Sequence, residues 1–188
     1  CIKGRQHCTN RLVNYINSID TKLNIFFADG SEFYQSEIIN RVSKNHKVHY
    51  EKFEYDKDFD SFIKKIYLSL KKINTKFFCF WDTDDFLNLE KVFFHLEFLK
   101  NNTDYVCSIG KIVNFNLVDN SSIELIGDQY SGQKTSDFKK NFVFDDFSCW
   151  EALHHTEKML KILKSISDAK FNDIRNISGA INQYFQIL

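Results

Sequence analysis

The stretch FFCFWDTDDF at residues 77–86 decides the fold prediction. Its first five residues form an uninterrupted apolar run, which is typical of a strand buried on both faces of a parallel sheet. Three aspartates follow within four residues, and an amphipathic helical pattern comes next, over 89–99. The order of strand, acidic loop and helix predicts that these carboxylates lie at the carboxyl end of a strand near the centre of a sheet.

Strand and helix patterns alternate on both sides of this stretch. Further strands are predicted at 23–28, 47–53, 104–109 and 111–118. Helices are predicted from a cap at Thr9 to Ile19, and over 37–42, 59–73, 89–99, 150–166 and 171–187. The polar segment 119–140 has little periodicity and is predicted to be a flexible loop. Because helices and short apolar strands alternate, the expected fold class is α/β, with a mostly parallel central sheet flanked by helices.

Composition limits the classes of partner. The 188 residues, 43% of them hydrophobic, are enough for one compact domain. Lys plus Arg count 25 and Asp plus Glu count 25, so the net charge is zero and nucleic-acid binding is not expected. No apolar run approaches the roughly 18–20 residues of a transmembrane segment. Five widely spaced cysteines without a C-x-x-C pair favour a reducing compartment, the cytoplasm.

A second short motif is expected to share the position of the acidic loop. The residues Asp29-Gly30-Ser31 follow the predicted strand at 23–28, as Asp82 to Asp85 follow the strand at 77–81. Ligands of open α/β sheets bind outside the carboxyl ends of the strands. If the two strands are parallel neighbours, both loops lie on one rim of the sheet.

The acidic loop itself indicates a divalent cation. Asp82, Asp84 and Asp85 would repel one another unless a cation or hydrogen-bond donors compensate their charges. Hard oxygen ligands suit Mg²⁺ or Mn²⁺, and Mg²⁺ commonly takes one or two carboxylates together with phosphate oxygens of a substrate. A charged turn that caps the next helix is the alternative. The spacing fits neither a haloacid-dehalogenase-like phosphatase, an EF-hand nor a polymerase-type nucleotidyltransferase, and neither a P-loop nor a dinucleotide motif is present.

Three segments together resemble a known enzyme family. The run from Lys3-Gly4-Arg5 through Thr9, Arg11 and Tyr15, the segment IFFADGSE at 25–32 and the segment FWDTDDF at 80–86 resemble the GT-A glycosyltransferases of family-2 type. Within that family they resemble a bacterial group with KGR, ADGS and D-x-D-D segments. The resemblance covers residues 1–118 and extends weakly to 175. It implies one GT-A-like domain over 1–188, a nucleotide-sugar-binding sandwich with its nucleotide-binding half at 1–118 and its acceptor-side half at 119–188. It also implies that part of the family's first strand would precede Cys1.

The resemblance assigns roles to the residues of these motifs. Asp29 would contact the nucleobase or ribose of the donor, and Asp82 the ribose or the metal. Asp84 would bind the Mg²⁺ or Mn²⁺ that bridges the diphosphate, with Asp85 as its substitute. Lys3 and Arg5 would lie near the nucleotide.

An inverting member of the family also needs a general base. The resemblance points to Asp173, in the segment FNDI, with Asp145 and Asp146 in reserve. His154 and His155 are read either as a third metal ligand or, preferably, as a solvated pair on a helix surface.

The function expected from the resemblance is transfer of a sugar, with inversion, from a nucleoside diphosphate donor, UDP being the expected nucleotide. The acceptor would be a saccharide or a lipid-linked saccharide, as in polysaccharide biosynthesis. The enzyme would work in the cytoplasm, free or peripherally at the inner face of the membrane. A metal-dependent phosphohydrolase and a catalytically inert nucleotide-sugar-binding domain are the alternatives.

Overall fold

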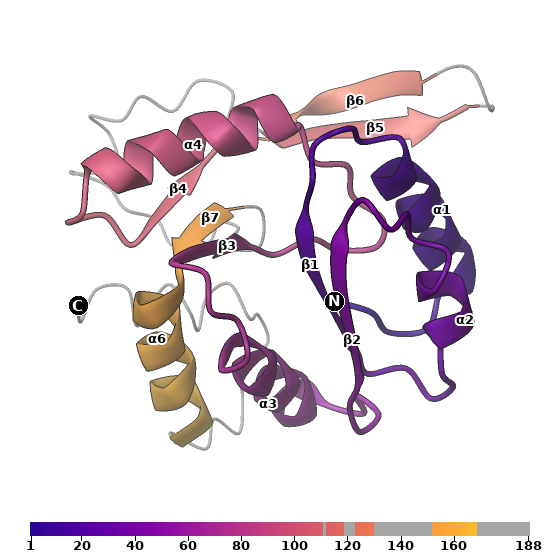
Figure 1. The fold of residues 1–188 in the computed structure, drawn as a ribbon, viewed down its shortest axis with the longest axis horizontal. Coiled ribbons are helices and arrows are strands. Elements are labelled where there is room, and N and C mark those ends of the chain that lie inside the picture. The colour runs from indigo at the N-terminus through magenta and orange to yellow at the C-terminus, as the bar shows by residue number, and fades with distance from the viewer. Residues whose placement is uncertain (111, 119–122, 130–151, 169–188) are drawn as a thin grey trace.

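A computed structural model describes residues 1–110, 112–118, 123–129 and 152–168. Helices and strands alternate along the chain as Figure 1 shows, in the order α1 (Gln6–Asn17), β1 (Asn24–Asp29), α2 (Ser36–Ile39), β2 (Lys47–Lys52), α3 (Phe59–Leu70), β3 (Phe77–Cys79), α4 (Leu89–Asn101), β4 (Cys107–Ile109), β5 (Ile112–Leu117), β6 (Ile123–Gln129), β7 (Ala152–His155) and α6 (Thr156–Asp168). The chain is therefore mixed α/β, as predicted.

The amino-terminal half is built on a parallel pair of strands. β1 and β2 pair in register from Asn24 opposite Lys47 to Asp29 opposite Lys52, with α2 in the connection between them. On the other edge of β1, Ile2 forms a parallel bridge with Asp29. The apolar side of this unit is a cluster from the amino-terminal segment, α1, β1 and α2, namely Ile2, Leu12, Val13, Ile16, Phe27 and Ile39. This unit holds the Asp29 loop at the carboxyl end of β1.

The second sheet differs from the prediction. β7 lies between β3 and β4 and runs antiparallel to both, so the expectation of a mostly parallel central sheet is wrong for these strands. β3 and β4 are linked through α4 and run in the same direction, but a strand from much later in the chain separates them. The hydrophobic periodicity of residues 77–109 cannot indicate that a strand at 152–155 pairs between β3 and β4. β3 is also shorter and less deeply buried than its apolar sequence predicts.

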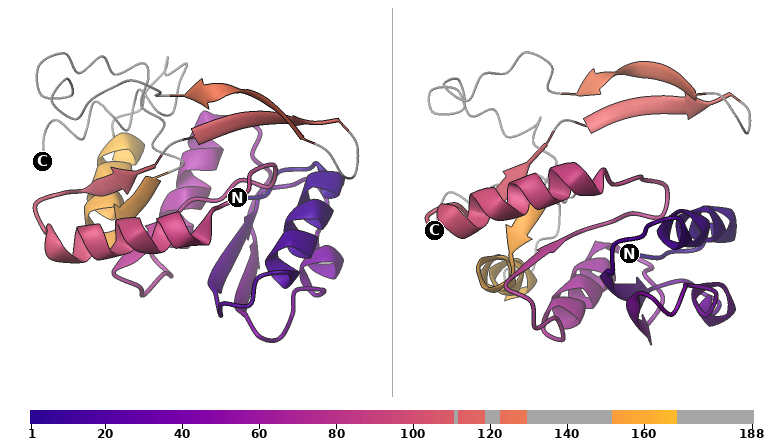
Figure 2. Two further views of the ribbon diagram at one scale, coloured as in Figure 1. Left: turned by 90° about the horizontal axis from the view of Figure 1, so that it is seen from above. Right: turned by 45° about the horizontal axis from the view of Figure 1, so that its top comes forward.

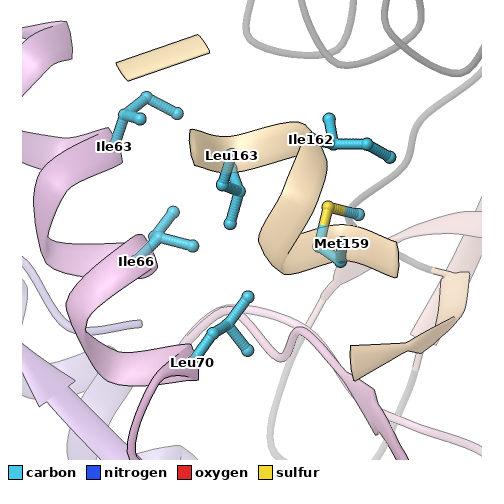
Figure 3. Packing of buried hydrophobic residues seen from close by; sticks show 6 residues of the cluster. All are labelled: Ile63, Ile66, Leu70, Met159, Ile162 and Leu163. Carbon is cyan, nitrogen blue, oxygen red and sulfur yellow. The ribbon is translucent and has the colours of Figure 1, made fainter. Parts of the chain in front are cut away.

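Helices α3 and α6 pack against each other through apolar side chains (Figure 3). Their buried side chains are Ile63, Ile66 and Leu70 from α3 and Met159, Ile162 and Leu163 from α6. α3 begins at a capping box, in which Asp58 accepts a hydrogen bond from the Ser61 backbone N–H at 2.9 Å and Ser61 Oγ accepts from the Asp58 N–H at 3.2 Å. The long apolar stripe predicted over 59–73 thus forms a helix over Phe59–Leu70.

A hairpin of β5 and β6 extends toward α1 (Figure 2). The Phe115 ring of β5 lies 5.9 Å from the ring of Phe86, at the end of the acidic motif. The strand predicted at 111–118 is confirmed. The flexible loop predicted over 119–140 is wrong for 123–129, where β6 pairs with β5, and its remainder lies outside the described residues.

Two helix predictions also need correction. α1 begins at Gln6, so Thr9 lies inside the helix, fully buried, and does not cap it. The segment that was predicted to begin a helix at 150 forms strand β7 over 152–155 before α6 starts at Thr156. The helix predicted over 171–187 lies outside the described residues.

Candidate functional site

The KGR segment forms a tight turn that contacts the Asp29 loop. Gly4 and Arg5 have positive φ angles of 63° and 43°, which glycine tolerates readily and arginine does not. The Gly4 N–H donates to Ser31 Oγ at 2.8 Å, and Gln35 Nε2 lies 2.7 Å from the Gly4 carbonyl and 2.8 Å from Ser31 Oγ. The turn after Ile2 and the turn after β1 are therefore one hydrogen-bonded unit.

The same turn directs Arg5 toward the acidic loop. The Arg5 guanidinium binds the Asp84 carboxylate in a bidentate pair, at 2.6 Å and 3.2 Å. The hydrogen bond to Asp84 raises the pKa of Arg5 above its ordinary value. Both side chains are about half exposed, at 54% and 42%, and a pair of that exposure contributes about 0–1 kcal/mol to stability. Arg5 thus balances the charge of Asp84 through a contact that a ligand can exchange.

Helix α1 anchors the rest of the acidic loop. Arg11 Nη2 donates to the Asp84 carbonyl at 3.1 Å, and Tyr15 donates its hydroxyl to the Leu87 carbonyl at 2.7 Å. The Arg11 guanidinium also lies 5.4 Å above the Phe86 ring. Two guanidinium groups, from Arg5 and Arg11, therefore meet the loop that bears the aspartates.

Asp82 and Asp85 lie on a turn closed within the loop itself. The Asp85 N–H donates to the Asp82 carbonyl at 3.3 Å, and Trp81 Nε1 donates to the Asp85 carbonyl at 3.1 Å. Both aspartates are exposed, and Asp82 Oδ1 lies 3.9 Å from the amino group of Cys1. Burial lowers the pKa of that amino group, and Asp82 opposes the shift.

Asp29 has a different environment from the other aspartates. Its side chain is fully buried, and its carboxylate accepts hydrogen bonds from the Ser31 N–H at 2.8 Å, the Gln35 N–H at 3.3 Å and the Tyr50 hydroxyl at 2.6 Å. Burial, followed by the bond to Asp29, raises the pKa of Tyr50. In this geometry Asp29 organises the turn, in which Gly30 and Ser31 are also buried, and the first exposed side chain after it is that of Glu32.

The remaining predicted residues lie apart from this network or outside the described residues. Lys3 is exposed, with its ammonium 5.5 Å from the centre of the Tyr55 ring. His154 and His155 lie on strand β7, and His154 is fully buried against Phe78, so the interpretation as a solvated pair on a helix is wrong. Asp173, Asp145 and Asp146 lie outside the described residues.

A divalent cation fits the site only with further oxygen ligands from a substrate or from water. Across residues 1–110, 112–118, 123–129 and 152–168, no group of three or more His, Cys, Asp or Glu side chains is placed to hold a metal ion. Asp82 and Asp84 nevertheless present exposed carboxylate oxygens of the kind that Mg²⁺ and Mn²⁺ prefer. Because each carboxylate oxygen has two lone pairs, Asp84 can accept a cation while Arg5 remains close. A mode with one or two carboxylates and several phosphate or water oxygens suits this donor set.

Sequence reasoning missed the residues that join the three segments. Gln35 and Tyr50 both bind Asp29, and Gln35 also contacts Gly4 and Ser31. Neither belongs to a recognisable motif. Arg11 and Tyr15 belong to the run that carries the resemblance, but no role was assigned to them there. Their spacing of four places them on one face of a helix, and only the structure shows that this face meets the acidic loop.

The comparisons with known proteins add no family assignment: no protein-family model and no curated protein matches the chain. In the part of the chain that the structure describes, no helix is both long enough and apolar enough to cross a membrane.

Proposed function

We propose that the chain is a GT-A-like, metal-dependent glycosyltransferase domain that binds a nucleoside diphosphate sugar, with UDP as the nucleotide. One observation carries the proposal: the segments at 3–5, 29–31 and 82–85, far apart in sequence, converge at one place. The hydrogen bond from the Gly4 N–H to Ser31 Oγ joins the segments at 3–5 and 29–31. The ion pair between Arg5 and Asp84 joins the segments at 3–5 and 82–85. A domain organised as nucleotide-binding residues 1–118 and acceptor-side residues 119–188 belongs to the same proposal.

The charges at this place suit a diphosphate with a divalent cation. Asp82 and Asp84 would hold Mg²⁺ or Mn²⁺, with Asp85 beside them, and Arg5 and Arg11 lie close enough to the loop to contact phosphate oxygens. The ion, when bound, would supply positive charge that offsets the charge developing on the departing nucleoside diphosphate. Arg5 is released from Asp84 at little cost, since the ion pair is half exposed.

The buried polar network gives the site its rigidity. Asp29 fixes the loop through Ser31, Gln35 and Tyr50, so that loop is formed before a ligand arrives. Donors already aimed at a ligand cost no reorganisation when charge develops. The roles of Asp173 as general base, of a saccharide or lipid-linked saccharide as acceptor and of inversion stay predictions.

Calorimetric titration of UDP in Mn²⁺ and again in EDTA tests the proposal. We expect binding in Mn²⁺ and none in EDTA. Asp84→Asn should lower the UDP affinity in Mn²⁺ by at least tenfold, and Asp104→Asn, at an exposed aspartate beyond α4, should leave it unchanged. Metal-independent binding, or an Asp84→Asn affinity equal to that of the Asp104→Asn control, would contradict the metal site.

Arg5→Gln separates two roles of the guanidinium. Loss of the competing cation should tighten the binding of Mn²⁺ alone, because Asp84 is released. Loss of the Arg5 charge near the diphosphate should weaken the binding of UDP in the presence of Mn²⁺. Opposite shifts are expected only if Arg5 exchanges between Asp84 and phosphate, so parallel shifts would refute the exchange.

Turnover distinguishes the remaining alternatives. Release of UDP from UDP-sugars that requires a saccharide acceptor is expected of the transferase. Mn²⁺-dependent UDP binding without turnover of any donor would favour an inert nucleotide-sugar-binding domain. Release of inorganic phosphate from p-nitrophenyl phosphate, abolished by Asp84→Asn, would favour a phosphohydrolase.

A further inference from the structure

The hairpin of β5 and β6 has one apolar face. Because side chains alternate along a strand, Val113 and Phe115 of β5 lie on one face, and Asn114 and Asn116 lie on the other. Leu125 of β6 pairs directly with Phe115, and residues paired in this way share a face. Val113, Phe115 and Leu125 therefore form one surface, called here the hairpin face.

The hairpin face is open to solvent although it is apolar. Val113 is 47% exposed and Leu125 is 67% exposed. An antiparallel sheet commonly packs its apolar face on the core and leaves its polar face in water. Among the residues that the structure describes, β5 and β6 pair only with each other, and Asn114 and Asn116 on the opposite face are exposed too. Neighbouring apolar side chains that remain exposed in this way commonly mark a binding surface.

A β-bulge adds to the hairpin face beside Phe115. The register shifts between Asn114 and Phe115, which leaves Ile126 of β6 without a residue opposite it. The Ile126 side chain is 61% exposed and directly follows that of Leu125. Bulges occur often next to active sites, where they redirect side chains. Two successive apolar side chains therefore reach solvent at one place.

The hairpin face begins at the acidic loop. The Phe115 ring lies 5.9 Å from the ring of Phe86, which directly follows Asp85. Phe86 is held from α1, with the Tyr15 ring at 5.0 Å and the Arg11 guanidinium at 5.4 Å, and it is still 37% exposed. Figure 2 shows the hairpin extending toward α1. A group bound on the hairpin face therefore lies next to the loop that carries the aspartates.

We propose that the hairpin face binds the aliphatic chain of an amphiphilic acceptor, so that the acceptor is a saccharide joined to such a chain and not a free saccharide. The inference rests on the proposed function, which places the metal and the sugar donor at the acidic loop. The resemblance leaves both kinds of acceptor open, and the hairpin residues that decide between them lie outside the motifs that carry it.

The chemistry of the hairpin face selects the part of the acceptor that it binds. The side chains of Val113, Phe115 and Leu125 carry neither a charge nor a hydrogen-bonding group. Sugar hydroxyls bound there would lose their hydrogen bonds to water without replacement, whereas an aliphatic chain loses nothing. The chain therefore lies on the hairpin face, and the saccharide extends past Phe86 to the acidic loop.

The direction of the hairpin face also separates this ligand from a bilayer or a second copy of the chain. Leu125 and Val113 share the face on which Phe115 contacts Phe86, so this face turns toward the acidic loop and not away from the molecule. A flexible chain of a few carbon atoms can follow such a surface. A flat bilayer or another folded chain needs a surface that projects outward.

Two probes with the same sugar test the inference on the 188-residue chain. They are n-octyl β-D-glucopyranoside, kept below its critical micelle concentration, and methyl β-D-glucopyranoside. Affinity is measured by NMR from the amide shifts of Val113 and Leu125. We expect the octyl chain to raise the affinity by at least about 100-fold, since each CH₂ group that leaves water contributes.

Variants on the two faces of the hairpin locate the chain. Leu125→Asn should lower the affinity for octyl glucoside about tenfold and leave that for methyl glucoside unchanged. Asn116→Ser, on the polar face, is the matched control and should change neither affinity. Val113→Thr tests the same face at a second residue and should lower the octyl glucoside affinity about threefold to fivefold. Equal affinities for the two probes, or equal effects of Leu125→Asn and Asn116→Ser, would overturn the proposal.

Mn²⁺ bound together with UDP gives the orientation of the probe, because the ion broadens the NMR signals of nearby protons. The glucose protons of octyl glucoside should broaden more than the terminal methyl protons of its chain, with Mg²⁺ as the diamagnetic control. Strongest broadening at the terminal methyl group would overturn the proposal. Failure of UDP to bind in Mn²⁺ would refute the proposed function and the acceptor role with it, whereas failure of octyl glucoside beside intact UDP binding would refute the hairpin face alone.

Two further measurements identify the other occupants. Co-sedimentation with phosphatidylglycerol vesicles that Leu125→Asn abolishes, without any preference for octyl over methyl glucoside, would assign the hairpin face to a bilayer. A dimer in size-exclusion chromatography that Leu125→Asn dissociates would assign it to a second copy of the chain. Either result would overturn the proposal.

Discussion

Replacing Lys65 by methionine tests the buried ion pair that supports the Asp29 loop. Lys65 Nζ contacts Asp56 Oδ2, and the two side chains are 1% and 0% exposed. Asp56 lies directly against Gly30 and donates its backbone N–H to the Gly30 carbonyl at 3.0 Å. The pair therefore connects α3 to the turn that follows β1.

The magnitude follows from the burial of both charges. Methionine keeps an unbranched apolar stem but removes the ammonium, which leaves the Asp56 carboxylate buried without its cation. Asp56 Oδ1 has no hydrogen-bond partner among the described residues, so no hydrogen bond to that oxygen offsets the loss of the Lys65 ammonium. Removing one partner of such a pair costs about 3–5 kcal/mol, a large share of the roughly 5–15 kcal/mol that stabilises a domain. Asp56→Asn together with Lys65→Met removes both charges and should therefore cost less stability than Lys65→Met alone.

Urea unfolding at pH 7, followed by circular dichroism, gives these free energies. Lys64→Met is the matched control, because Lys64 is the exposed neighbour on the same helix and its replacement should change stability by less than about 0.5 kcal/mol. A Lys65→Met free energy of unfolding within that margin of the unmodified chain would refute the reasoning. So would a double variant that loses the full sum of the two single losses, since the charges would then not be coupled.

Three further predictions concern the same half of the molecule. In Gly30→Ala the new Cβ meets the Asp56 carboxylate, so the free energy of unfolding should fall by about 1–3 kcal/mol, and an unchanged urea midpoint would contradict the close contact. Tyr50→Phe removes the hydroxyl that donates to Asp29 and should cost about 1–3 kcal/mol, with UDP affinity as a second readout. Hydrogen bonds from the cap lower the pKa of Asp58, so its stabilising effect is present above the unfolded pKa near 4 and is lost as the pH falls below it. Asp58→Ala should therefore lower the melting temperature at pH 7 and much less at pH 3, and equal losses at both would refute that sign.

Local elements were predictable where an apolar stripe alone determines them. The stripe of Ile63, Ile66 and Leu70 predicted α3, and its side chains form the buried face that meets α6. The apolar run before Asp29 predicted β1. Helix starts were less predictable, because α1 begins after a left-handed turn at Gly4 and Arg5 that no periodicity reveals.

Sheet topology was predictable only in part. The alternation of strands and helices predicted the parallel pairing of β1 and β2, which the register confirms. It could not predict that β7 separates β3 from β4, because Ala152 to His155 reads equally well as the first turn of the following helix. Pairing partners far apart in sequence are chosen by tertiary packing, which a local pattern does not encode.

In the candidate site, too, the motifs themselves were predictable, whereas the residues that position them were not. The acidic loop and the Asp29 turn stood out because turn residues and carboxylates followed apolar runs. That Arg5 pairs with Asp84 required the positive φ angles of the KGR turn, and that Asp29 is buried required Tyr50 from the neighbouring strand. These interactions form only between turns and strands that the sheet topology brings together. They could therefore not be predicted before the topology was known.

The acidic loop and the amino-terminal segment are coupled through five consecutive residues, Cys1 to Arg5. Ile2 is hydrogen-bonded to β1, and the turn at Gly4 that directs Arg5 toward Asp84 begins two residues later. The hydrogen bonds of Cys1 to the Trp81 carbonyl and of Ile2 to β1 hold the backbone before that turn from two sides and so restrict its conformations. Because the Arg5 pair itself contributes little energy, the order of the backbone before it decides how often the guanidinium faces the acidic loop. The paired backbone therefore pre-organises the cationic side of the site without adding any contact to a ligand.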